Sequence, residues 1–258
     1  MIIGNGKTTV NMQHVSIRGG SEAQLNNIYA SGQLAIHKHK NVLLKNNIIS
    51  QSEADDGINI KNSKFAQISD NIFKNNYADH IDLDNTDGNV FNNEFVNEIK
   101  NKEGDGLDLS GSNVIVSNNN FYNFEDKGIS VGEKSKTILE SNIFKNNRSA
   151  ITAKDQSLVI LTSENIFTDN QFDIEMYVKK PFFTGATVCN LDSVNDLKVS
   201  KINFLNSKIS DKDIDKQNIY IQKTKKQKFK INDVNNFSLN TNYKNIIEEF
   251  ANLNCKFD

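Results

Sequence analysis

Short stretches of alternating apolar and polar residues recur along the first two-thirds of the chain. Each stretch has a central aliphatic residue, and successive ones are separated by 22 to 26 residues: Ile36, Ile58, Ile81, Leu107, Ile129, Ile151 and Ile174. A second set, mostly phenylalanines, recurs with the same period: Ile49, Phe73, Phe95, Phe121, Phe144 and Phe167. The longest interval falls in the same repeat in both sets, so the two patterns describe one repeated unit.

Each repeat contains three short runs with the two-residue period of a β-strand. Examples are INIK at 58–61, NVIV at 113–116 and NIF at 71–73. Three strands and three turns in about 22 residues predict one coil of a right-handed parallel β-helix. The consensus of a leucine-rich repeat is missing, and an up-and-down barrel would require hairpin turns between the strands. In a stack, coils lie about 4.8 Å apart, so equivalent residues form columns and the central aliphatics face the core.

Asparagine occupies the position two residues before each member of the second set: Asn47, Asn71, Asn93, Asn119, Asn142 and Asn165. Asparagine tolerates the left-handed backbone conformation, and stacked asparagines can hydrogen-bond to one another. We therefore predict a structural asparagine ladder at this corner of the coils.

The pattern predicts an all-β fold, with a single right-handed parallel β-helix of about six to eight coils over residues 1–185. Residues 186–258 are expected to form a cap region, with strands within 197–209 and 217–224. A terminal helix over 242–254 would place Ile246, Ile247, Phe250 and Leu253 on one face and cover the open end of the stack. The lysine run Lys223–Lys230 is interpreted as a solvated edge, with a nucleic-acid contact as the alternative.

Composition narrows the classes of protein. The net charge of −2 lacks the basic excess of a nucleic-acid binder, and no run of 18 apolar residues exists to span a membrane. The first ten residues lack the basic start and apolar run of a signal peptide. We expect an extracellular or cell-envelope location if the protein is exported, with the chain being a fragment of a longer product as one alternative. Cys189 and Cys255 match no metal-binding spacing, and we expect two buried thiols, with one disulfide as the alternative.

The most informative local feature is a group of acidic residues around the central aliphatics. Residues that flank an inward residue in a strand face outward, so Asp82 and Asp108 should be neighbours, with Asp84 diagonal to them. Like charges stacked in this way repel, and a bound cation, a lysine or a raised pKa would compensate. Oxygen ligands suit Ca²⁺, and the candidate ligands are Asp79, Asp82, Asp84 and Asp105.

The same group could support catalysis. Removal of a proton next to a uronate carboxylate requires a base and a group that neutralises the carboxylate. The candidate catalytic residues are His80 as the base, Lys127 as charge partner, and Asp82 and Asp108. The structural alternative is that Asp-Gly pairs at strand starts are turn residues and that outward carboxylates keep the sheet soluble.

Four segments carry a family resemblance: DDGINIKNS, ADHIDLD, GDGLDLSGSNVIVSNNNF and DKGISVGEKS, all between residues 55 and 135. They resemble the right-handed parallel β-helix repeat family of the pectate-lyase-like superfamily, including β-helices of bacterial surface proteins. The resemblance implies polysaccharide lyases, glycoside hydrolases or C5-epimerases as relatives in fold. The chain departs from the epimerase Asp-Pro-His-Asp signature. It also lacks the arginine motif of pectate lyases, since its only arginines are Arg18 and Arg148.

Two functional hypotheses follow. The first is a carbohydrate-associated protein whose polar sheet face binds, and cleaves as a lyase or epimerises, an acidic polysaccharide, with Ca²⁺ as the cofactor. The second is a non-catalytic surface or scaffold repeat.

Overall fold

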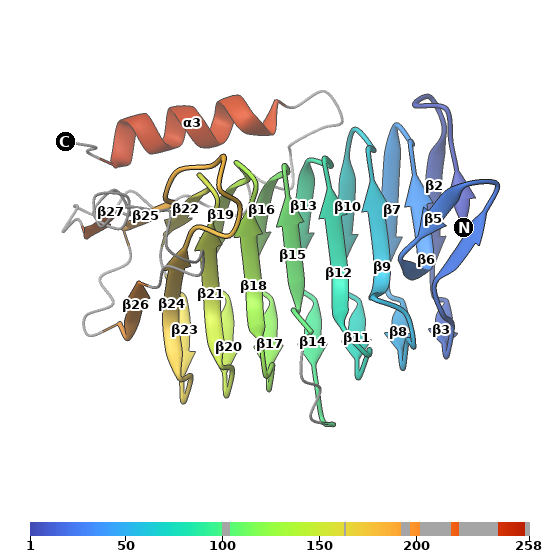
Figure 1. The fold of residues 1–258 in the computed structure, drawn as a ribbon, viewed down its shortest axis with the longest axis horizontal. Helices are drawn as coiled ribbons and strands as arrows, with labels where there is room; N and C mark the ends of the chain where they lie inside the picture. The colour runs from blue at the N-terminus through green and yellow to red at the C-terminus, as the bar shows by residue number, and fades with distance from the viewer. Residues whose placement is uncertain (100–103, 163, 192–196, 202–217, 222–241, 256–258) are drawn as a thin grey trace.

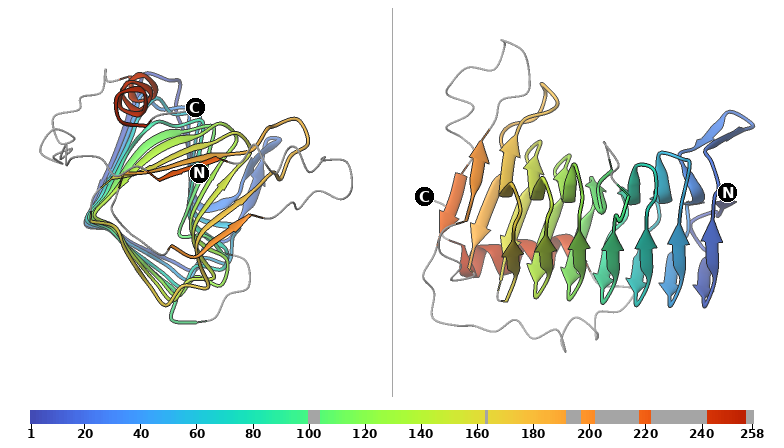
Figure 2. Two further views of the ribbon diagram at one scale, coloured as in Figure 1. Left: turned by 90° about the vertical axis from the view of Figure 1, so that its left-hand side faces the viewer. Right: turned by 90° about the horizontal axis from the view of Figure 1, so that it is seen from below.

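The computed structural model describes residues 1–99, 104–162, 164–191, 197–201, 218–221 and 242–255, which form a right-handed parallel β-solenoid of about 7 turns. Three parallel sheets, named A, B and C, run along the stack and enclose a core of roughly triangular section (Figure 1, Figure 2). The coils up to β23 each contribute one strand to each sheet in turn, because short strands alternate with sharp corners along the sequence. The predicted fold class is confirmed.

The strands follow one another in spatial order within each sheet. Sheet A contains β1 (Ile2–Ile3), β6 (Gly32–His37), β9 (Asp56–Lys61), β12 (Asp79–Asp84), β15 (Leu107–Ser110), β18 (Lys127–Gly132), β21 (Ser149–Lys154), β24 (Phe172–Tyr177) and β26 (Val199–Lys201). Sheet B contains β2 (Thr9–Gln13), β7 (Asn41–Lys45), β10 (Ala66–Ser69), β13 (Gly88–Phe91), β16 (Asn113–Ser117), β19 (Lys136–Glu140), β22 (Leu158–Leu161), β25 (Thr187–Asn190) and β27 (Asn218–Ile221). Sheet C contains β3 (Ser16–Arg18), β8 (Ile48–Ser50), β11 (Ile72–Lys74), β14 (Glu94–Val96), β17 (Asn120–Tyr122), β20 (Ile143–Lys145) and β23 (Ile166–Thr168).

Aliphatic columns fill the core. The first inward column of sheet A is buried throughout: Leu34, Ile58, Ile81, Leu107, Ile129, Ile151 and Ile174. Burial of each side chain stabilises the fold by roughly 1.5–3 kcal/mol. The prediction that Ile36 belongs to this column is wrong, because Ile36 pairs with Ile60 while Leu34 pairs with Ile58. A shift by two residues preserves the inside-outside alternation of a strand, so the pattern alone could not separate the two registers.

The phenylalanine column and the asparagine ladder are confirmed. In sheet C the rings of Phe73, Phe95, Phe121, Phe144 and Phe167 stack with centroids 4.7–5.2 Å apart. Each ladder asparagine from Asn47 to Asn142 donates from Nδ2 to Oδ1 of the next coil's asparagine at 2.9–3.2 Å. The left-handed conformation belongs instead to the residue before each ladder position: Asn46, Asp70, Asn92, Asn118, Ser141 and Glu164.

Helix α3 (Tyr243–Asn254) confirms the predicted terminal helix but lies along the outer face of sheet B (Figure 1). Its residues Ile247 and Ala251 pack with the outward residues Ile138 and Ile160. The prediction that the helix closes the open end of the stack is wrong, because this outward apolar strip of sheet B is what it covers. Leu253, expected on the packed face, is 83% exposed.

A disulfide joins Cys189 in β25 to Cys255, just after α3. The preference for two buried thiols is therefore wrong, since the docking of α3 brings together cysteines 66 residues apart. Strands β26 and β27 fall within the two segments predicted as strands. The run Lys223–Lys230 lies outside the described residues, and the boundary between 185 and 186 stays a prediction. In the described part of the chain, no helix is both long and apolar enough to cross a membrane.

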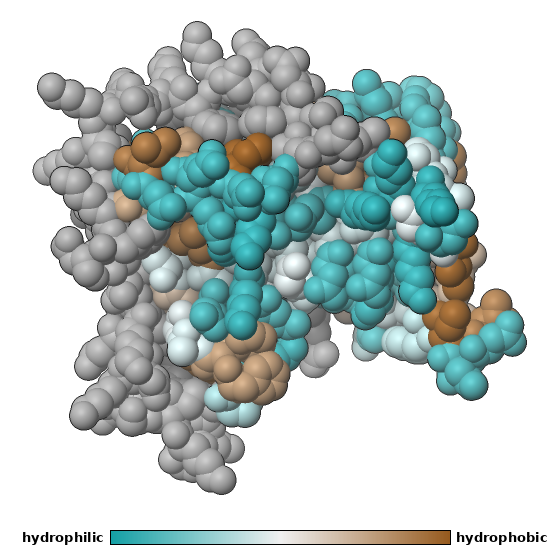
Figure 3. Space-filling model, turned by 90° about the horizontal axis from the view of Figure 1, so that it is seen from above, coloured by the Kyte–Doolittle hydropathy of each residue, from teal (hydrophilic) through white to brown (hydrophobic). Residues whose placement is uncertain are grey.

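Two segments project on the side of sheet A (Figure 2). They are the antiparallel hairpin of β4 (Ala23–Leu25) and β5 (Ile28–Ala30), and the 178–186 connection between β24 and β25. Both expose apolar side chains, with Leu25 59% and Phe182 75% exposed. Figure 3 shows these projections, with hydrophobic surface among hydrophilic surroundings, along one edge of the molecule. The outer face of sheet A is thus bordered near each end of the stack.

Candidate functional site

The outer face of sheet A carries a dense set of ionisable side chains, which we call the charged face. Its members lie in, or just before, the six successive strands from β9 to β24. They are Asp56, Asp79, Asp82, Asp84, Asp105, Asp108, Lys61, Lys127, Lys154 and Glu175. The residue after each first-column aliphatic faces outward, as the two-residue period of a strand requires. The predicted outward orientation of Asp82 and Asp108 is confirmed.

The strands of sheet A begin with an irregular step that turns two consecutive residues toward the core. A Cβ on Gly106 would lie 2.8 Å from the Phe121 ring and 3.1 Å from the Phe124 ring, so this position faces inward beside Leu107. The acidic residue before it, Asp105, then points outward with the residues of the charged face. Such a step resembles a β-bulge in re-aiming side chains at the start of a strand.

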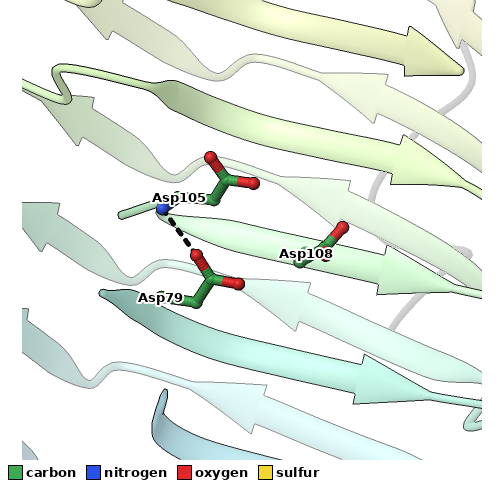
Figure 4. A group of neighbouring side chains, drawn as sticks. All are labelled: Asp79, Asp105 and Asp108. Atoms are coloured by element: carbon green, nitrogen blue, oxygen red, sulfur yellow. Dashed lines mark hydrogen bonds between the residues drawn. The ribbon is translucent and has the colours of Figure 1, made fainter. Parts of the chain in front are cut away.

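This step brings three carboxylates together. Asp79, Asp105 and Asp108 each offer an oxygen, and these oxygens lie within 4.8 Å of one another (Figure 4). Asp79 Oδ1 accepts a hydrogen bond from the backbone N–H of Asp105 at 2.8 Å. Asp108 Oδ1 is buried without a hydrogen-bond partner among the described residues and lies 3.8 Å from Lys154 Nζ. The carboxylate cluster is therefore only partly neutralised.

Two nearly buried lysines lie beside the cluster. Lys127 Nζ donates to both carboxylate oxygens of Asp105, at 3.1 and 3.3 Å, and also pairs with Asp126. Lys154 is 4% exposed and faces Asp108. Burial lowers the pKa of both lysines, but the nearby carboxylates outweigh it, so both pKa values lie above the ordinary value. Both lysines therefore keep their charge, and Lys127 occupies the place predicted for a charge partner.

Burial and mutual repulsion disfavour the ionised form of several carboxyl groups on the charged face. Burial raises the pKa of Asp56 and of Asp105 to about 7, and Lys127 opposes the effect on Asp105. Burial, together with the negative charge of Asp108, also raises the pKa of Asp79 and of Asp82 well above the ordinary value. A proton or a cation would relieve this repulsion. Perturbed carboxyl groups of this kind mark candidate functional sites.

Asp82 and Asp84 are held by a second set of contacts, on the N-terminal side of the cluster. Asn59 Nδ2 donates to Asp82 Oδ2 at 2.9 Å, and Lys61 Nζ pairs with Asp84 at 2.8 Å. His37, which is buried, contacts Asn59 Oδ1 through Nε2 at 2.8 Å. The predicted metal-ligand set is thus divided, because Asp79 and Asp105 group with Asp108 rather than with Asp82 and Asp84.

His80 does not lie on the charged face. It occupies the inward position equivalent to Gly106, has no exposed surface, and packs edge-on against Phe124 with ring centroids 5.0 Å apart. Its Nε2 contacts the Val96 carbonyl oxygen at 3.2 Å, and burial lowers its pKa to about 4. The prediction that His80, next to the inward Ile81, faces outward among the carboxylates is wrong, because the irregular step at the strand start reverses its direction. It is not placed to act as a base on this face.

A further charged network was missed in the sequence. Arg148 donates to both carboxylate oxygens of Glu175, at 3.1 and 2.8 Å, and to Asp126 at 3.1 Å. Glu175 has no exposed surface and also accepts from Thr152 at 3.3 Å. A signal did exist, because Glu175 continues the outward column of Asp108 by strand register. The network extends the charged face toward the C-terminal coils.

The comparisons with known proteins agree with the fold. Residues 96–192 match the family model described as a right-handed beta helix region, and the parallel solenoid is consistent with the pectate-lyase-like superfamily. A search of curated proteins found no match. The fold supports a carbohydrate-associated or structural repeat protein, and any finer function has to be argued from the charged face itself.

Proposed function

We propose that the charged face binds Ca²⁺ and, beside the ion, the carboxylate groups of an acidic polysaccharide. The observation that carries the proposal is the group of three carboxylates, Asp79, Asp105 and Asp108, drawn from two neighbouring coils onto one outer face. Like charges at this separation are unfavourable unless a cation or a proton lies among them. A repeat fold alone does not require them, since other coils carry serine or threonine at the same positions.

Calcium fits the donor set better than other common cations. The donors are all oxygens, which Ca²⁺ prefers, and neither histidine nor cysteine joins the cluster in the described residues. Two oxygens on opposite sides of a Ca²⁺ lie about 4.8 Å apart, because each bond is about 2.4 Å long. The oxygens of the cluster already lie within 4.8 Å of one another. Water and a sugar carboxylate would complete the usual coordination number.

Lys127 and Lys154 supply the second half of the binding face. Each keeps its positive charge next to the acidic cluster, where a sugar carboxylate could contact both the cation and an ammonium group. The hairpin and the 178–186 connection border the face and present exposed apolar side chains to a bound chain. The proposal is binding alone, because His80, the expected base, faces the core.

The disulfide favours an oxidising compartment, and we include an extracellular or cell-envelope location in the proposal. Polysaccharides that carry uronates are available there. The alternative is a structural repeat that contacts no sugar, and it is an outcome of the following experiment.

Calcium binding can be measured by isothermal titration calorimetry on the native protein and on Asp108→Asn. Asparagine fits this column, because Asn59 lies two coils away in the same register, so the variant should fold. We expect Asp108→Asn to weaken Ca²⁺ binding by at least about tenfold. The control is Asp70→Asn, a carboxylate in a left-handed corner outside the charged face, which should bind Ca²⁺ as the native protein does.

Polysaccharide binding is then measured by co-sedimentation with covalently cross-linked polygalacturonate and alginate gels, which stay insoluble both with Ca²⁺ and with EDTA. Retention that needs Ca²⁺ and is lost in Asp108→Asn supports the proposal. Calcium binding without retention by either gel would leave a structural cation site and refute the sugar part. No calcium binding would favour the scaffold.

A further inference from the structure

A hollow of about 720 Å³ lies along the stacked turns that connect sheet C to sheet A in successive coils. Polar residues make up most of its lining, with the amides of Asn97, Asn123, Asn146 and Gln171 beside Arg148 and three carboxylates. The volume falls within the range of about 300–1,000 Å³ that small-molecule sites occupy. None of Asp79, Asp105 or Asp108 lines it, so the hollow is separate from the carboxylate cluster of the charged face.

Asn97 is the unusual member of this wall. It is 3% exposed, and neither its Nδ2 nor its Oδ1 has a hydrogen-bond partner among the described residues. Buried amides are normally hydrogen-bonded, and an unpaired one is costly enough to need an explanation. By strand register Asn97 corresponds to Asn123 and Asn146 of the next coils, which are exposed and have positive φ. Asn97 lacks that conformation and is turned into the protein instead.

The amide wall has the chemistry of a hydroxyl-binding site. Each asparagine amide offers a donor and an acceptor, which suits neighbouring hydroxyl groups on a sugar ring. Asn146 Nδ2 donates to Asn123 Oδ1 at 3.3 Å, so these two amides form a fixed row along the stack. Arg148 is held by ion pairs with Asp126 and Glu175 and is therefore already neutralised. The hollow also carries the carboxylates of Glu98, Glu125 and Asp169, so it disfavours an anionic ligand and leaves the amides to select a neutral one.

We propose that this hollow is a second binding site, which takes a neutral, hydroxyl-rich sugar segment, and that the Asn97 amide is its specificity contact. Asn97 lines the hollow, and no described residue forms a hydrogen bond with its amide, so a ligand hydroxyl group would supply the partner that the amide lacks. Binding there uses neither Ca²⁺ nor the lysines of the charged face. The site is therefore independent of the function proposed above.

The central variant is Asn97→Leu, which keeps the number and branching of the side-chain heavy atoms and removes both polar atoms. Because the amide has no hydrogen-bond partner among the described residues, the variant should unfold at the same or a higher urea concentration than the native protein. Ligand binding is measured by calorimetry in EDTA with three neutral hexasaccharides as probes: cellohexaose, maltohexaose and hexa-N-acetylchitohexaose. We expect the native protein to bind at least one probe and Asn97→Leu to bind it more than about tenfold more weakly.

Two further variants keep the test decisive. Gln171→Ala removes an exposed amide of the same wall and should also weaken binding of the probe, which keeps the test possible if Asn97→Leu fails to fold. Asp108→Asn should bind the probe as the native protein does, while Asn97→Leu should keep native Ca²⁺ affinity. No binding of any probe by the native protein at millimolar concentration, or unchanged binding in both wall variants, would overturn the proposal.

Discussion

The disulfide between Cys189 and Cys255 should contribute a large part of the stability of the C-terminal coils. The two cysteines are 66 residues apart, so the bond closes a long loop in the unfolded chain. The loop-entropy relation gives about 4 kcal/mol for a loop of this length at 25 °C. The bond also ties the end of α3 to β25, where Ile247 and Ala251 cover the outward residues of sheet B. Reduction should therefore loosen α3 before the stack itself unfolds.

The assay is urea unfolding followed by far-ultraviolet circular dichroism, with and without reductant. We expect reduction to lower the unfolding free energy by about 4 kcal/mol, and Cys189→Ser/Cys255→Ser to show the lowered value in both conditions. A thiol titration of the urea-unfolded native protein should find no reactive thiols before reduction. Two reactive thiols, or a loss below about 1 kcal/mol on reduction, would refute the reasoning.

Three further predictions concern the ladder and the charged face. Asn119→Ala should lower the unfolding free energy by about 3 kcal/mol or more, since it removes bonds to Val90 O and to two ladder neighbours; urea unfolding measures it, and a loss below about 1 kcal/mol would count against the ladder. Because the pKa of Asp56 and of Asp105 is raised to about 7, the folded protein binds more protons than the unfolded chain between about pH 4 and 7. Stability without Ca²⁺ should therefore fall as the pH rises through this window, by up to about 1.4 kcal/mol per pH unit for each group, and a rise in a series of urea melts would contradict this. Lys127→Met should cost about 3 kcal/mol at pH 8, where it leaves the Asp105 carboxylate unpaired, and much less at pH 5, where that group is protonated; equal losses at the two pH values would disprove the pairing.

The fold could be predicted from the sequence because the core residues of a solenoid recur with one period along the chain. Two columns with a common period were enough to identify the coils, and the phenylalanine stack and the asparagine ladder appear where the period placed them. The register failed only in the first coil, where Leu34 and Ile36 both satisfy the alternation. Such an ambiguity of two residues is resolved by pairing with the next strand, which periodicity does not contain.

The candidate site was only partly predictable. The outward positions of Asp82 and Asp108 follow from strand alternation, but the direction of His80 depends on an irregular step at the strand start. The glycines at the equivalent positions gave a hint, since Gly106 leaves room for phenylalanine rings and therefore faces the core. The grouping of Asp79 and Asp105 with Asp108 depends on the same step. Alternation alone therefore identified the acidic residues of the site but not which of them lie close together.

Other features depend on contacts between segments far apart in sequence. The disulfide and the position of α3 result from an apolar strip on the outer face of sheet B, which is distributed over several coils. That the Asn97 amide has no hydrogen-bond partner in the described part of the chain is visible only when its neighbours in space are known. No local pattern distinguishes Asn97 from the asparagines that follow it in the same corner.

The most direct test of the charged face as a cation site is a crystal structure of the protein soaked with Tb³⁺, an oxygen-seeking substitute for Ca²⁺ that gives a strong anomalous signal. We expect the main anomalous peak among the carboxylates of Asp79, Asp105 and Asp108, at about 2.3–2.6 Å from their oxygens. That peak should disappear in Asp108→Asn and remain in Asp70→Asn. A soaked crystal with its peaks elsewhere, and none among these three carboxylates, would contradict the central claim.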